Sequence, residues 1–96
     1  MRAVALNADN ADAHFNLGVL LGARHQIADA VVHLRRAADL NPRNADAHRN
    51  LAVALAMSGQ LDAGIAEARE AIGLQPAWPA ARKTLQDLLT AKSVSR

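Results

Sequence analysis

The sequence predicts an all-α protein in which antiparallel helical hairpins follow one another within a single domain, residues 1–96. The chain has 23 Ala and 13 Leu but only 11 Val, Ile and Thr together, a composition that favours helices over strands. Residues 11–44 align with residues 45–78 without a gap, and 13 of the 34 positions are identical. Apolar residues in each half recur at the spacing of two amphipathic helices, so each 34-residue unit reads as one hairpin.

This period divides the chain into repeats. Residues 1–10 match the end of a repeat, 11–44 and 45–78 are complete repeats, 79–91 form a half repeat, and 92–96 are predicted to fray. The expected helices are 2–7, 11–23, 27–40, 45–57, 61–74 and 79–91. Asn10 and Asn44 are suited to cap helix starts, and Gly59, Pro42 and Pro76 mark helix ends.

The half repeat is interpreted as a cap helix for the C-terminal end of the array. Arg82 and Gln86 stand where the preceding repeat has His48 and Ala52. Because these positions would face a second helix of the same hairpin, polar residues there indicate a surface turned to solvent. At the other end, the Leu20 side of the first hairpin is poorly covered, which predicts either a longer array or self-association into a homo-oligomer.

Charge and composition exclude several functions. The chain carries 11 Lys and Arg against 9 Asp and Glu, a net charge of +2, and has no basic stripe with interleaved aromatic residues, so we expect no nucleic-acid partner. Cysteine is absent, which excludes disulfides and thiolate metal sites. No apolar run approaches the roughly 20 residues of a membrane span. We therefore expect a cytoplasmic protein with no membrane partner.

Catalytic and metal-binding patterns are also missing from the sequence. It contains no Gly-rich phosphate loop, no Gly-x-Ser-x-Gly elbow and no nucleophilic cysteine, so we expect neither an enzyme nor a cofactor. His14 and His48 occupy equivalent positions about 8–10 Å apart, one helix spacing, which is too far to share a zinc ion. They are interpreted as half-buried packing residues. No role is assigned to His25 or His33.

The repeat resembles the tetratricopeptide repeat, whose signature is W-x2-L-G-x2-Y, then A-x3-F, then P. The first repeat places at these positions His14, Leu17-Gly18, Leu21, Ala30, Leu34 and Pro42; the second places there His48, Leu51-Ala52, Leu55, Gly64, Ala68 and Pro76. The large aromatic residues are replaced, but the small and turn residues remain. The resemblance implies a right-handed superhelical α-solenoid whose first helices line a concave inner face.

Helical geometry selects the residues on that inner face, opposite the core stripe. Asp, Asn and Val recur there in both repeats, although solvent-facing positions have no packing reason to repeat. The predicted partner-binding residues are Asp12, Phe15, Asn16, Val19, Asp46, Arg49, Asn50, Val53, Met57, Lys83 and Thr84. Together they predict a scaffold that binds a protein or an extended peptide.

Two subfamilies offer more specific hypotheses. Stacked Asn16 and Asn50 resemble the asparagine ladder of O-linked N-acetylglucosamine transferases, which implies amide side chains that pair with the main chain of a peptide. The carboxylate clamp of co-chaperones, in contrast, matches at one of five positions: these are Phe15, Val19, Asn50, Ala80 and Thr84. Alternatively, the chain is a substrate-recruiting arm of a larger enzyme, such as a glycosyltransferase or sulfotransferase, or a structural spacer. Trp78 is interpreted as packing under the last helix or as an anchor in the groove.

Overall fold

The computed structural model describes residues 10–94 and confirms the all-α prediction. This part of the chain forms five helices and no strand. They are α2 (Ala11–Ala23), α3 (Ile27–Leu40), α4 (Ala45–Met57), α5 (Leu61–Leu74) and α6 (Pro79–Val94). The first four begin and end at the predicted residues. The helix expected at 2–7 lies outside the described residues.

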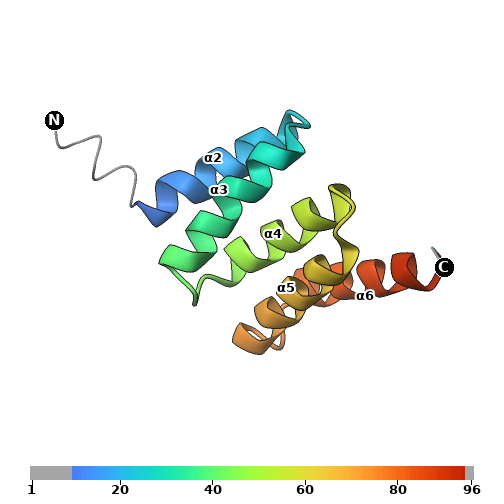
Figure 1. Cartoon of the computed structure of the whole chain (residues 1–96). Helices are drawn as coiled ribbons and strands as arrows, with labels where there is room; N and C mark the ends of the chain where they lie inside the picture. The colour runs from blue at the N-terminus through green and yellow to red at the C-terminus, as the bar shows by residue number, and fades with distance from the viewer. Residues whose placement is uncertain (1–9, 95–96) are drawn as a thin grey trace, which may run out of the picture.

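The helices form an elongated array of hairpins, with principal extents of 50 × 27 × 17 Å. In Figure 1, α2 and α3 lie side by side as the first hairpin, and α4 leads to α5 and α6. Each hairpin packs internally, α3 packs on α4, and α5 packs on α6. The first helices also touch in order, α2 with α4 and α4 with α6. This arrangement places the predicted binding residues on neighbouring helices.

Local sequence accounts for the helix ends. The Asn10 and Asn44 side-chain oxygens accept hydrogen bonds from the backbone N–H groups of Ala13 and Ala47, at 3.0 and 3.1 Å. Each cap satisfies a donor that the first helical turn leaves unpaired. The turn inside the second hairpin uses Gly59 with φ +89°, whereas the first hairpin has His25 there with φ 62°.

Small residues let the paired helices approach closely. A Cβ on Gly18 would lie 2.5 Å from Leu34 Cγ, and a Cβ on Gly64 would lie 2.7 Å from the Ala52 carbonyl oxygen. Around these crossings, one buried cluster joins the first hairpin to α4 and a second joins the second hairpin to α6. Leu51 and Leu55 of α4 are fully buried, so α4 is the central element of the array.

The predicted C-terminal fraying is wrong for residues 92–94, because α6 continues to Val94. The Lys92 Nζ atom lies 2.7 Å from Asp62 Oδ1 at the start of α5. This contact ties the last turn of α6 to the second hairpin, and a sequence pattern based on apolar spacing gives no sign of it.

Candidate peptide-binding face

Seven of the predicted residues form a surface on α2 and α4 that we call the inner wall: Asp12, Asn16, Val19, Asp46, Asn50, Val53 and Met57. Asp12, Asn16 and Asp46 are exposed, and Asn50 and Val53 are half-buried. Two apolar members also face solvent, since Val19 is 42% and Met57 54% exposed. Exposed apolar side chains that gather on neighbouring helices are typical of a contact surface.

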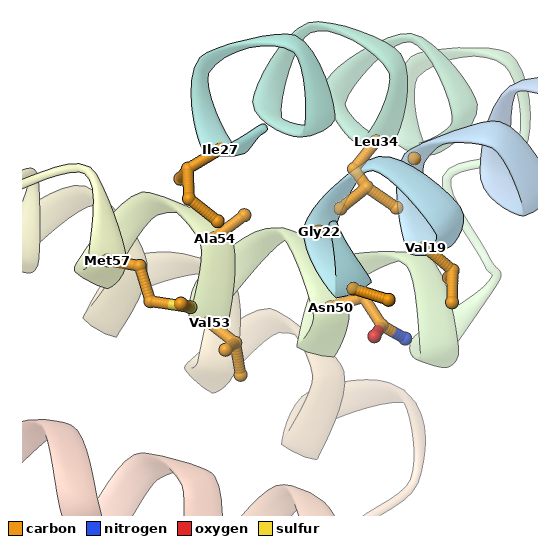
Figure 2. A pocket seen from close by; sticks show the side chains of 10 residues that line it. Val19, Gly22, Ile27, Leu34, Asn50, Val53, Ala54 and Met57 are labelled. Carbon is orange, nitrogen blue, oxygen red and sulfur yellow. The ribbon is translucent and has the colours of Figure 1, made fainter. Parts of the chain in front are cut away.

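A cleft of about 170 Å³ opens in this wall between the first hairpin and α4. Its lining consists of Gly18, Val19, Gly22, Ala23, Ile27, Leu34, Asn50, Val53, Ala54 and Met57. Figure 2 shows Ile27 and Leu34 reaching from α3 toward α4, with Ala54 opposite them and Val53, Met57 and Asn50 along the α4 side. The structure therefore brings Val19, Asn50, Val53 and Met57 together around one hollow.

The side-chain amide of Asn50 already forms one hydrogen bond within its own helix. Its Nδ2 atom donates a 2.9 Å hydrogen bond to the Asp46 carbonyl oxygen, one turn earlier. The Oδ1 atom is a hydrogen-bond acceptor, and Asn16 at the equivalent place on α2 is exposed. That these two amides pair with the main chain of a peptide stays a prediction.

Thr84 does not extend this wall into α6, contrary to the prediction. It occupies the position equivalent to Asn16 and Asn50, but it is buried, with only 8% exposed. Its hydroxyl donates to the Ala80 carbonyl oxygen at 3.0 Å and accepts from Arg49 Nη1 at 3.4 Å. Thr84 is therefore buried where α4 meets α6, and its hydroxyl is hydrogen-bonded to both helices.

Arg49 of α4 contacts Trp78, the residue just before α6. The guanidinium carbon of Arg49 lies 5.4 Å from the centre of the Trp78 ring, a distance at which a cation is attracted to the ring face. Arg49 Nε is buried without a hydrogen-bond partner, so the ring contact and the Thr84 bond hold this side chain. Trp78 is thus half-buried against α4, neither wholly beneath the last helix nor free in the groove.

The remaining predicted residues have separate surroundings. Phe15 is half-buried and packs against the first core cluster. Lys83 is exposed and pairs with Asp87 one turn later on α6, with Nζ–Oδ2 at 3.2 Å. Such an exposed pair contributes about 0–1 kcal/mol, so Lys83 can be redirected toward a bound partner at little cost.

His48 joins the two helices of the second hairpin. Its Nδ1 atom lies 2.7 Å from Glu67 Oε1 and its Nε2 atom 2.8 Å from the Pro42 carbonyl oxygen. Both ring nitrogens therefore face acceptors, an arrangement that suits the protonated ring. Burial lowers the pKa of His48, but the hydrogen bonds to Glu67 and Pro42 and the charges of Glu67 and Glu70 raise it above its ordinary value of 6.5.

The first hairpin has a different pair at the same positions, His14 and His33. Their Nδ1 atoms are 3.0 Å apart, the ring centres 5.3 Å apart and the ring planes 22° apart. These distances agree only if both nitrogens lie near the line between the ring centres, so the rings meet edge to edge. One Nδ1 donates a hydrogen and the other accepts it. The sequence assigned no role to His33, although positions 14 and 33 recur as 48 and 67.

Sequence reasoning also missed the back of the cleft, formed by Gly22, Ile27, Leu34 and Ala54. These residues belong to core-facing positions, so a search limited to solvent-facing stripes passes over them. The sequence does contain an indication of the cleft, namely a difference in side-chain size between equivalent positions of the two repeats. Gly22 and Ala54 are smaller than Ala56 and Leu88, which hold the same positions one repeat later.

Among residues 10–94, no three His, Asp or Glu side chains gather as ligands for a metal ion. No helix in that described part of the chain combines the length and apolar character needed to cross a bilayer.

Comparison with known proteins identifies the repeat. A family model described as a TPR repeat, the tetratricopeptide repeat, matches residues 23–59. Among solved structures, a crystal structure of MamA superimposes with a TM-score of 0.86 and 25% identity, covering 95% of this chain and 53% of that one. No curated protein matches the sequence.

Two further structures extend the comparison. An O-GlcNAc transferase from Thermobaculum terrenum gives a TM-score of 0.88 and 33% identity over 99% of this chain, which corresponds to 18% of the transferase. The first TPR domain of Spaghetti, solved with an HSP90 peptide of sequence SRMEEVD, gives 0.85 and 17% identity, covering 90% of this chain and 68% of that one. Residues 23–59 therefore match the tetratricopeptide repeat, and the described helices share the fold of these solved structures. The chain spans about half the length of the MamA structure.

Proposed function

We propose that this chain is a protein-interaction scaffold whose inner wall binds an extended peptide segment of a partner. The observation that carries this proposal is the cleft, because it opens among Val19, Asn50, Val53 and Met57, four residues that the repeat resemblance and the helical spacing predicted to contact a partner. A cleft lined mainly by apolar side chains with one amide at its edge suits a peptide that buries a side chain and pairs its main chain.

The chemistry of the wall argues against an acidic peptide terminus as the ligand. At the clamp positions, Phe15 and Val19 cannot bind carboxylates, Ala80 has no polar side-chain atom, and Thr84 is buried. The HSP90 peptide bound by the Spaghetti domain ends in two glutamates, valine and aspartate. A ligand of that composition is not what this wall would select, although the fold is shared.

The test compares two exposed valines on the two helices of the first hairpin. Val19 on α2 is 42% exposed at the cleft, and Val32 on α3 is 63% exposed on the outer side. A phage library of random nine-residue peptides is selected on the wild-type chain, and the affinities of enriched peptides are measured by calorimetry. Val19→Arg should weaken binding by on the order of tenfold or more, as expected for a central contact, while Val32→Arg leaves it unchanged. Equal losses, or loss only with Val32→Arg, would contradict the proposal.

A second candidate is that the chain recruits substrates for a larger enzyme. The 33% identity to the Thermobaculum terrenum O-GlcNAc transferase over 99% of this chain favours it. The gene that encodes this chain supplies the test. A glycosyltransferase domain in the same reading frame would support a recruiting arm, and a reading frame without any catalytic domain would reject it.

A spacer that associates with itself is the remaining alternative. Leu17 and Leu20 of α2 are 39% and 50% exposed, on the side of the first hairpin away from α4. Light scattering across a hundredfold concentration range distinguishes the cases, because self-association through this side predicts a mass that rises toward the dimer, and Leu20→Glu should then restore the monomer.

A further inference from the structure

We infer that the cleft holds one aliphatic side chain of leucine or methionine size from the bound segment, and that a Lys or Arg stands three or four residues from this anchor. The inference rests on the proposed function, since it names the peptide chemistry that the inner wall selects. It follows from a comparison of the cleft with its counterpart one repeat later and from the charges beside it.

The counterpart of the cleft lies between the second hairpin and α6, and there the space is filled. The positions of Gly18, Gly22, Ile27, Leu34 and Ala54 are taken in the next repeat by Ala52, Ala56, Leu61, Ala68 and Leu88. All five of these residues belong to one apolar cluster. Leu88 is 8% exposed within it, so the molecule itself shows which kind of side chain the same helix arrangement accommodates.

The cleft remains open because the differences in side-chain volume between the two copies do not cancel locally. Leu34 is larger than Ala68, and it occupies the space above Gly18, where a Cβ would lie 2.5 Å from its Cγ. Around Gly22 nothing compensates, since a Cβ there would meet only the Ala30 Cβ, at 3.9 Å. Ala54 then leaves vacant the volume that Leu88 fills in the other copy.

The lining determines the polarity of the occupant. Of the ten lining residues only Asn50 has a polar side chain, and its Nδ2 atom is already bonded to the Asp46 carbonyl oxygen. A polar or charged side chain would lose its water without gaining partners in the cleft. An aliphatic side chain instead gains free energy in proportion to the apolar surface that it buries.

Charge beside the cleft selects the second feature of the segment. Asp12 and Asp46 are both exposed, each in the first turn of its helix, on the part of the inner wall away from Met57. No ion pair is formed by either aspartate with the described residues. Two carboxylates on one wall favour a cationic side chain of the partner.

The helix rise sets the spacing between the two features. Asp46 lies about two helical turns before the cleft residues Val53 and Ala54, or about 11 Å along α4 at 1.5 Å per residue. An extended peptide covers that distance in about three residues at roughly 3.3 Å each. From Asp12 to the middle of the cleft the path is about 13 Å, or four residues.

The decisive variant copies the filled site into the open one. Leu34→Ala combined with Ala54→Leu places in the cleft the pair found at Ala68 and Leu88, so total side-chain volume is conserved and the fold should be retained. Gly22→Ala is an independent variant that adds one methyl group to the cleft with room around it. Asp12→Asn combined with Asp46→Asn removes the charges and keeps the shapes.

The probe is the random nine-residue phage library, selected on the wild-type chain, with circular dichroism melts to verify each variant. We expect enrichment of Leu, Met or Ile with Lys or Arg three or four residues away. Affinity for these peptides should fall on the order of tenfold with the Leu34–Ala54 exchange, by a smaller factor with Gly22→Ala, and several-fold with the aspartate pair, more so at low salt.

The alternative outcomes separate this inference from the function on which it rests. Peptides that bind the exchange variant and Gly22→Ala within twofold of wild type, yet are lost with Val19→Arg, overturn the buried anchor and leave peptide binding intact. Enrichment of acidic peptides overturns the charge assignment. A library that enriches no peptide on the wild-type chain contradicts the inference together with peptide binding itself.

Discussion

The first and second repeats share 13 of 34 residues, yet their apolar and polar contacts are distributed differently. Leu17 and Leu51 are equivalent, but Leu17 is 39% exposed and Leu51 is fully buried. The reason is position in the array, since α4 packs on α3 and α5 and also touches α2 and α6. The same residue thus contributes to stability according to how many neighbouring helices surround it.

The polar pairs make a second contrast. His14 shares one hydrogen with His33 in the first repeat, whereas His48 in the second faces both Glu67 and the Pro42 carbonyl. The helix positions are the same, 19 residues apart in each case. The two repeats therefore differ at one position, where the first has His33 and the second has Glu67. The second repeat forms an ion pair there, whereas the first forms a pair of rings of which only one can donate a hydrogen from Nδ1.

Leucine truncation gives the largest expected contrast. Leu51→Ala removes a fully buried side chain and should lower the free energy of unfolding by about 2–5 kcal/mol. Leu17→Ala should cost less than about 1 kcal/mol, because much of that side chain is already in water. Urea denaturation of both variants is the measurement. Equal losses would show that the first repeat is as well covered as the second.

Glycine substitution within α5 gives the next effect. Gly64→Ala places a Cβ against the backbone oxygen of Ala52, so α4 and α5 must separate, at a cost of about 1–3 kcal/mol. Gly73→Ala is the control on the same helix, because nothing lies within 4 Å of its Cβ position. It should stabilise by up to about 1 kcal/mol through helix propensity. Thermal melts that rank the two variants in the opposite order would reject the close crossing.

The pH dependence of stability tests the histidine contrast. Because the folded pKa of His48 lies above 6.5, its interaction with Glu67 stabilises fully below the unfolded pKa and is lost as pH rises through the folded pKa. Glu67→Gln should therefore cost about 1 kcal/mol at pH 5.5–6 and much less at pH 9. His33→Glu puts a carboxylate at the equivalent position of the first repeat, where we expect a pH dependence of the same sign. Urea titrations at several pH values measure both, and a loss for Glu67→Gln that grows with pH has the wrong sign.

The hairpin turns give the smallest contrast. His25 has φ 62° where Gly59 has φ +89°, and only glycine adopts this region without a steric cost. His25→Gly should stabilise by about 0.5 kcal/mol, because relief of strain is partly offset by the added freedom of the unfolded chain. Differential scanning calorimetry resolves such a change, and a lowered melting temperature would indicate that the His25 side chain makes a contact of its own.

The 34-residue period and the turn residues were sufficient to predict the hairpins, because helix ends depend on local groups such as Asn10, Asn44 and Pro42. The inner wall could be predicted because the helical period places Val19 and Val53 opposite the core. Contacts between long side chains could not be predicted from the sequence. Thr84 was predicted to face a partner, but its hydroxyl is bound by Arg49 and Ala80. Lys92 was predicted to fray, because the sequence pattern does not reveal a contact with Asp62, which is 30 residues away.

The cleft shows a limit of another kind. Its walls are Gly22, Leu34 and Ala54 as much as the exposed valines, and a hollow depends on the sum of several side-chain volumes rather than on any one residue. Only alignment of the two copies, position by position and by size, makes Leu88 visible as the side chain that Ala54 lacks. Repeat proteins allow such a comparison within one sequence.

The central claim is that a partner peptide lies on the wall formed by α2 and α4. Amide chemical-shift mapping of the labelled chain, titrated with the most strongly enriched library peptide, tests it most directly. We expect the largest shifts at Val19, Gly22, Asn50 and Val53, with Val32 and Asp39 on the outer side of α3 unchanged. Shifts confined to α3, or to the exposed Leu17 and Leu20, would contradict the account and place the partner elsewhere on the array.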